Sequence, residues 1–139
     1  MNRAQLQQLA EDRILDAERL LTGARWAGAY YLAGYAVECG LKACIMVHVQ
    51  ATGAIFLDKK YSEKCWTHDL KDLLALANLA PTLAADASAN SALAANWAIV
   101  KDWKEISRYE QKTQTDAQAM YDAIANNSDG ILPWIRIRW

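Results

Sequence analysis

An all-α fold is predicted by the composition of this 139-residue chain. Hydrophobic residues make up 53% of it and alanine is the most frequent type, whereas only 6 residues are glycine and 2 are proline. Alanine costs the least free energy in a helix and proline the most, so this composition indicates closely packed helices. The length suits one domain over residues 1–139, and no repeat, linker or low-complexity segment divides it.

Charge and residue usage exclude several classes of protein. The 15 basic and 16 acidic residues give a net charge of −1, which excludes a generally basic nucleic-acid coat and allows only a local basic site. The apolar fraction excludes a disordered chain. Residues 1–13 lack the apolar segment of a secretory signal, and three cysteines are an odd number for a disulfide framework. We therefore expect a cytoplasmic protein.

Two long helices are predicted in the first third of the chain. Apolar residues recur at helical spacing over residues 2–22, and a second, longer helix is expected over 24–51. Glu38 and Lys42 interrupt the apolar stretch 26–57. Because its charge-free parts are shorter than the ~20 residues that span a bilayer, we expect a buried central helix and no membrane contact.

The middle of the chain is expected to be less regular. Residues 54–66 are predicted to form a loop with a β-like patch. Thr67 or Asp69 can cap a third helix, with Asp72 three residues after Asp69. Pro81 is expected to end that helix.

Two more helices are predicted before the C-terminal tail. The small polar residues of 82–90 suggest a loop or loose turn, followed by a helix over 91–110. A fifth helix is expected over 115–126, ending at the breaker cluster 126–130. In the tail, Pro133 suits the first turn of a short helix.

The second helix carries two distinct faces. Small residues three or four positions apart form one face and allow another helix to approach closely: Ala29, Ala33, Ala36, Gly40 and Ala43. Polar side chains form a second row: Tyr31, Tyr35, Glu38 and Lys42. This row is either a solvated stripe or one side of a polar cleft. A buried acid needs a partner, and Arg108 in the fourth helix is a candidate.

Several segments, in order along the chain, resemble the HEPN domain family (higher eukaryotes and prokaryotes nucleotide-binding domain). They are AGAYYLAGYAVECGLKA at 27–43, preceded by residues 17–21 and Gly23; His68-Asp69-Leu70; Trp97 to Trp103 with Arg108-Tyr109; and Pro133-Trp134-Ile135 with Trp139. The resemblance covers nearly the whole chain.

The resemblance implies an up-and-down antiparallel bundle of four to five helices, often a homodimer. Members of the family commonly occur in prokaryotic toxin–antitoxin and defence systems, frequently beside a minimal nucleotidyltransferase. Many are metal-independent ribonucleases, and others are non-catalytic and bind nucleotides or RNA.

One departure from the family pattern bears on catalysis. The family's ribonucleases carry an arginine, four to six residues, and then a histidine. Arg108 resembles the start of that motif, but positions 113–115 read Thr-Gln-Thr, and neither His48 nor His68 follows an arginine at this spacing. The sequence therefore favours a non-catalytic module over an enzyme.

The predicted module binds a nucleotide, RNA or a nucleotidyltransferase partner. Its ligand-binding cleft is expected to consist of Tyr31, Tyr35, Glu38, Lys42, Arg108 and Tyr109. The alternative is a divergent metal-independent ribonuclease that uses Arg108 with Tyr109, His68 or Glu38 in place of the missing histidine.

Four further residues have metal-ligand chemistry. Cys44 and His48 share a helix face, and Cys65 and His68 form a second pair, so the four could surround zinc. The more ordinary interpretation makes Cys44 a core residue and lets His68 donate a hydrogen bond near Glu38. We expect that interpretation, with no metal. No glycine-rich phosphate loop is present, so no other cofactor is expected.

Overall fold

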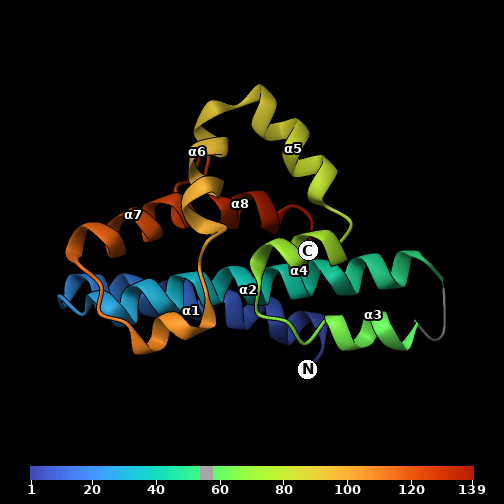
Figure 1. Cartoon of the computed structure of the whole chain (residues 1–139), viewed down its shortest axis with the longest axis horizontal. Coiled ribbons are helices and arrows are strands. Elements are labelled where there is room, and N and C mark those ends of the chain that lie inside the picture. The colour runs from blue at the N-terminus through green and yellow to red at the C-terminus, as the bar shows by residue number, and fades with distance from the viewer. Residues whose placement is uncertain (54–57) are drawn as a thin grey trace.

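The computed structural model describes residues 1–53 and 58–139, which form helices and contain no β-strand (Figure 1). This confirms the all-α class. The elements are α1 Arg3–Thr22, α2 Trp26–Ala51, α3 Lys59–Lys64, α4 Leu70–Leu76, α5 Ala80–Ala89, α6 Ser91–Val100, the 3₁₀ helix η1 Glu105–Tyr109, α7 Gln114–Ala125 and α8 Ile131–Arg136.

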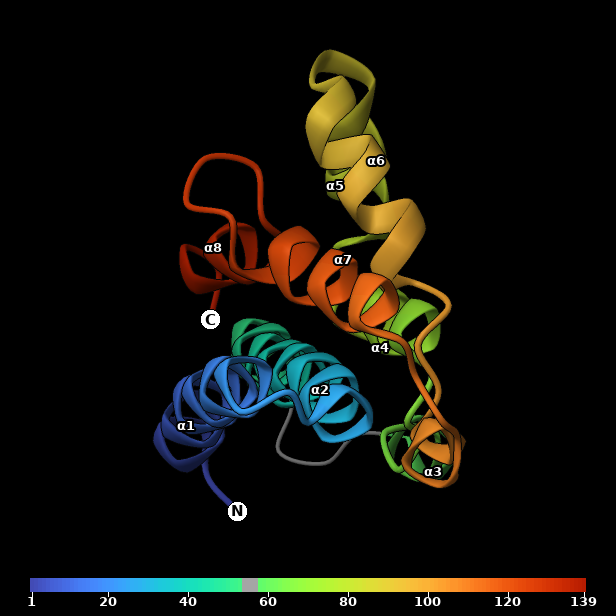
Figure 2. The ribbon, with the colours of Figure 1, turned by 90° about the vertical axis from the view of Figure 1, so that its left-hand side faces the viewer.

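The first two helices lie side by side and form the base of the molecule (Figures 1 and 2). Asn2 begins α1 with a capping box, in which its side chain accepts from the backbone of Gln5 and the Gln5 side chain accepts in return. Gly23 caps the end of α1 by donating its backbone N–H to the carbonyl of Arg19, and Ala24 turns the chain with a φ of 56°. Both long helices were predicted correctly.

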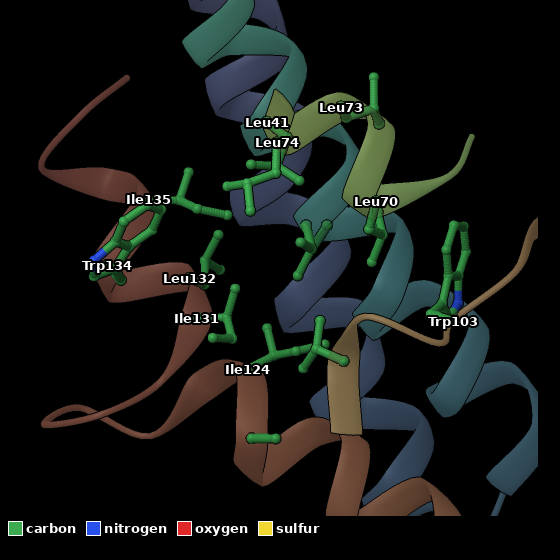
Figure 3. Close-up of a cluster of buried hydrophobic side chains, with 14 of the residues drawn as sticks. Leu41, Leu70, Leu73, Leu74, Trp103, Ile124, Ile131, Leu132, Trp134 and Ile135 are labelled. Carbon is green, nitrogen blue, oxygen red and sulfur yellow. The ribbon is translucent and has the colours of Figure 1, made fainter. Parts of the chain in front are cut away.

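Most of the core lies between α2 and the helices α4, α7 and α8, and Ile14 and Ala17 of α1 complete it. Leu41 of α2 meets leucines of α4 and apolar residues of α7 and α8 there (Figure 3). The small-residue face of α2 is buried, as expected from its spacing. At Gly40 an added Cβ would lie 3.0 Å from Ile135 and 3.4 Å from Trp139, so the end of the chain packs directly on this glycine.

The last helix also ties the end of the chain to its beginning. Arg136 forms two hydrogen bonds of 2.7 Å with the carboxylate of Glu11 in α1. Arg138 stacks its guanidinium 3.9 Å from the centre of the Trp134 ring and bonds Asp86 of α5. These bidentate and stacked arginines fix the position of α8 against two other helices.

In the described part of the chain, α2 is the one helix long and apolar enough to cross a membrane. Of its most apolar stretch, 61% is buried inside the structure. The helix is therefore a core element of this fold.

Helices α5 and α6 form a hairpin that projects from the rest of the molecule (Figures 1 and 2). Its base contacts α4, α7 and α8. Asn90 links the two helices and caps α6 by accepting from the backbone of Ala92 and Leu93. Asp86 is the only charged side chain in the hairpin, and its buried residues are Leu83 of α5 with Leu93 and Val100 of α6.

Two expectations for the middle of the chain were wrong. Residues 59–64 form α3 in place of a loop, because Asp58 caps the helix at Lys60. The rest of the predicted β-like patch, 54–57, lies outside the described residues. Pro81 does not end a helix. Asn78, with a φ of 58°, follows the end of α4, and Pro81 lies in the first turn of α5, where a missing N–H costs little.

Two further expectations were wrong in the same region. Residues 82–90 belong largely to helix α5, because the helix propensity of alanine outweighs the turn preference of the intervening polar residues. The single helix expected over 91–110 is two elements, α6 and η1. The chain leaves the helix after Val100 so that Trp103 can pack on α2.

Candidate functional site

A chain of acidic and basic side chains connects the buried side of α2 with the surface at η1. The order is Lys42, Glu38, His68, Glu105 and Arg108, with each neighbouring pair in contact. We call this the Lys42–Arg108 network. It joins three segments that lie far apart in the sequence, and it contains four of the residues proposed from sequence for binding or catalysis.

Glu38 is the buried centre of the network. It is 2% exposed, and its Oε1 lies 2.9 Å from both Lys42 Nζ and His68 Nδ1. The polar row of α2 is therefore not a solvated stripe at this position. Arg108, a candidate partner of Glu38, does not contact it, because His68 and Glu105 lie between them.

His68 bridges the two carboxylates of the network. Its Nδ1 lies 2.9 Å from Glu38 Oε1 and its Nε2 lies 3.2 Å from Glu105 Oε2. The Nδ1 contact is a hydrogen bond in which Nδ1–H donates, because a carboxylate only accepts, whereas the Nε2 contact with Glu105 is a close approach of ion-pair length without hydrogen-bond geometry. His68 thus reaches Glu38 as expected from sequence, and its position fixes the two acids relative to each other.

Asp69 holds the His68 loop in place. Its side chain caps α4 by accepting from the backbone of Lys71 and Asp72, and it forms a 2.6 Å ion pair with Lys104 just before η1. The hydrogen bond from Lys104 and those from the backbone lower the pKa of Asp69 below its usual value, against a smaller opposing effect of burial. The predicted cap therefore also connects the loop to η1.

Two neighbouring residues of η1 form the exposed end of the network. Arg108 contacts Glu105 at 3.1 Å, and its guanidinium lies 4.9 Å from the centre of the Tyr109 ring. Tyr109 is 75% exposed. Glu105 was not predicted from sequence. Its position three residues before an arginine is a signal for a local ion pair, but nothing local relates it to His68.

Trp103 anchors η1 on α2. Its ring is fully buried and stacks on Tyr31 at a centroid distance of 5.7 Å. A Cβ added at Gly34 would lie 2.1 Å from this indole, so only glycine leaves room for it. Tyr31 in turn stacks on Tyr35 at 6.2 Å. Two of the predicted cleft tyrosines therefore belong to the ring stack on which Trp103, and with it η1, is packed.

Tyr35, Glu38 and Lys42 also line a cavity of about 380 Å³ on another part of the surface. Arg108 and Tyr109 do not line it. Burial and the nearby Glu38 raise the pKa of the neighbouring Cys39 thiol to about 11, so this cysteine is a poor nucleophile at neutral pH. The predicted cleft residues therefore do not form one cleft: Tyr35, Glu38 and Lys42 line this cavity, whereas Arg108 and Tyr109 lie at the other end of the network.

The four candidate zinc ligands do not form a site in the described part of the chain. No group of three or more histidine, cysteine, aspartate or glutamate side chains there could hold a metal ion. Burial raises the pKa of the Cys44 thiol to about 12, which opposes the thiolate form that zinc requires. His68 is occupied by Glu38 and Glu105 instead.

Comparison with protein-family models, with curated proteins and with solved structures found no match to this chain.

Proposed function

We propose that this chain is a HEPN-like, non-catalytic helical module that binds RNA or a nucleotide through Arg108 and Tyr109. The supporting observation is the pairing of these two residues on the surface, with a guanidinium beside an exposed aromatic ring. A guanidinium binds phosphate, and a tyrosine ring stacks on an unpaired base. The two groups together match one nucleotide.

The rest of the network supports this proposal by fixing the position of η1. Trp103 holds one side of η1 on Gly34, and His68 holds Glu105. Glu105 makes the one ion pair of Arg108 within the described residues, so most guanidinium N–H donors remain for a ligand. A pre-positioned arginine loses less side-chain entropy on binding.

A second candidate function is a metal-independent ribonuclease. The supporting observation is that His68 and Arg108 both contact Glu105, although they lie 40 positions apart in the sequence. The His68 side chain is 44% exposed, so a substrate can reach it. In this reaction the ribose 2′-oxygen attacks the phosphate while its proton passes to Nε2 of His68, whose Nδ1–H donates to Glu38. The bond from phosphorus to the 5′-oxygen breaks, His68 returns the proton to that leaving oxygen, and Arg108 stabilises the charge on the phosphate.

One experiment separates the two functions. Labelled single-stranded RNA is incubated with the protein in EDTA, beside the variants Arg108→Ala and His68→Gln. Arg19→Ala is the matched control, because this arginine is exposed on α1 outside the network. Binding without cleavage, lost only in Arg108→Ala, supports the module.

Cleavage that both site variants abolish supports the ribonuclease. If RNA neither binds nor is cleaved, or if Arg19→Ala has the same effect as Arg108→Ala, the Arg108–Tyr109 site is refuted.

We also propose a homodimer, acting in the cytoplasm of a prokaryote within a toxin–antitoxin or defence system, with a minimal nucleotidyltransferase as partner. The sparsely charged surface of the α5–α6 hairpin supports a protein contact. Size-exclusion chromatography with light scattering tests the dimer, and a strictly monomeric result refutes it. Co-expression with a nucleotidyltransferase from a neighbouring gene tests the partner.

A further inference from the structure

The cavity beside the buried end of the network has the properties of a small-molecule site. Its volume of about 380 Å³ lies within the usual range for such sites, which starts near ~300 Å³. Leu6 and Leu9 of α1 form an apolar wall of the cavity. Trp66 also lines the cavity, and it is 82% exposed. A flat apolar ligand would cover this exposed indole.

Glu38 supplies a hydrogen-bond acceptor to this cavity. Both of its contacts use Oε1, and Oε2 forms no hydrogen bond with any residue in 1–53 or 58–139. The Glu38 side chain is 97% buried, but Oε2 is not among the fully buried unpaired polar atoms of the described residues, so this oxygen keeps some exposure that a ligand can use. Because Glu38 lines the cavity, a ligand there can reach Oε2 with an N–H or O–H donor.

Lys42 supplies donors beside that acceptor. Its ammonium has three N–H groups, and within the described residues one of them is used, toward Glu38 Oε1. The side chain lines the same cavity. A carbonyl oxygen next to the donor group of the ligand can therefore bind to Lys42.

The charges around Glu38 determine whether a neutral or a cationic ligand binds better. The carboxylate of Glu38 already contacts the ammonium of Lys42 and the imidazole of His68. A cationic ligand at Oε2 would repel Lys42 at short distance, whereas a neutral N–H group would not. The site therefore favours a neutral donor and acceptor held side by side.

We propose that this cavity binds a flat, neutral heteroaromatic lactam, whose N–H donates to Glu38 Oε2 and whose carbonyl accepts from Lys42. Its ring packs between the leucines of α1 and Trp66. The site shares Glu38 and Lys42 with the Lys42–Arg108 network but contains neither Arg108 nor Tyr109, so it does not depend on the proposed RNA-binding function.

Isothermal titration calorimetry with three matched probes tests the proposal. Isoquinolin-1(2H)-one has the lactam N–H and carbonyl, its N-methyl derivative lacks the N–H, and 1-aminoisoquinoline has the same shape but binds protons readily. We expect the lactam to bind about tenfold or more tightly than the N-methyl derivative, because the latter leaves Oε2 unpaired. Equal binding of the two, tighter binding of 1-aminoisoquinoline, or no binding of the lactam at millimolar concentration overturns the proposal.

Two variants test whether the lactam binds in this cavity, and measurements of folding show whether a loss of binding has another cause. Leu6→Trp fills the cavity without touching the ion pairs, and we expect it to abolish lactam binding while circular dichroism and the thermal midpoint stay near those of the parent. Lys42→Met removes the donor, and we expect at least about a tenfold loss. Persistence of lactam binding in a folded Leu6→Trp protein overturns the site.

Arg108→Ala separates this inference from the proposed function. The substitution lies outside the cavity, so lactam affinity is expected to be unchanged while RNA binding is lost. Lactam binding without RNA binding by the parent protein refutes the proposed function alone. RNA binding without lactam binding refutes the cavity site alone.

Discussion

The two ends of the Lys42–Arg108 network differ in their exposure to water. At one end Glu38 is buried between Lys42 and His68, and at the other Glu105 and Arg108 lie at the surface. A buried carboxylate depends on its partners, whereas a surface ion pair is screened by water and contributes little to stability. The buried end therefore contributes more to the stability of the fold, whereas the exposed end can bind RNA at little cost in stability.

The largest expected effect is at the buried end. Glu38→Ala leaves the ammonium of Lys42 and the imidazole of His68 without their acceptor and opens a void. We expect a loss of about 3 kcal/mol in the free energy of unfolding, at the low end for a broken buried pair because both partners are partly exposed. Urea denaturation measures it.

The matched control is Glu105→Ala at the exposed end of the same network. We expect it to change stability far less than Glu38→Ala and to reduce RNA binding. Similar losses of stability in the two variants would contradict the distinction between the two ends.

The next largest effect concerns the anchor of the exposed end. Gly34→Ala places a methyl group inside the space of the Trp103 indole, and overpacking of this kind costs about 1–3 kcal/mol. We expect η1 to lose its packing on α2, so that both the thermal midpoint and the affinity for RNA fall.

Gly28→Ala is the control for helix propensity in the same helix. Its Cβ would meet the flexible Leu20 side chain at 3.2 Å, and alanine favours a helix over glycine. Stability should stay the same or rise. If Gly34→Ala behaves like Gly28→Ala, the tryptophan anchor is wrong.

A smaller effect is expected at Asp69, which connects the His68 loop with η1. Asp69→Ala removes the cap of α4, and we expect a loss of about 1 kcal/mol. Asp69→Asn preserves capping but removes the ion pair with Lys104, so its loss should be smaller.

The pH dependence of the stability that Asp69 contributes follows from the direction in which its pKa is shifted. The folded pKa of Asp69 lies below its usual value of 3.8, so its stabilising contribution is complete above that value and disappears as pH falls through the lowered folded pKa. In urea denaturation, the difference between parent and Asp69→Asn should therefore shrink in strong acid. A difference that stays constant would show that the ion pair is not its cause.

The smallest effect concerns thiol reactivity near the buried end. Burial raises the pKa of Cys39 to about 11 and that of Cys44 to about 12, and both side chains are buried. Cys65 is partly exposed. Native alkylation followed by mass spectrometry should label Cys65 first, with equal rates only in urea. Early labelling of Cys39 would mean that this end is open to solvent.

Contacts within one helix could be predicted from the sequence, and contacts between segments largely could not. Glu38 and Lys42 form an ion pair because they are four residues apart on α2, and Asp69 caps its helix because of its own side chain. Glu105 and His68 are 37 positions apart, and no periodicity relates them.

The misassigned helix boundaries have a related cause. The end of α6 depends on where Trp103 finds space, and that space exists because residue 34 of another helix is glycine. Helix α5 has a local cause, since its alanines favour a helix more strongly than its serine and threonine favour a turn. Composition alone could have predicted α5 but not the end of α6.

The packing of the chain end on Gly40 has a consequence for the order of folding. Ile135 and Trp139 cover this part of α2, and Arg136 reaches Glu11 across 125 positions. During synthesis the first two helices therefore emerge long before the residues that cover them, which leaves an apolar helix face open to non-native association. The native packing of α2 is completed only when residues 131–139 have left the ribosome.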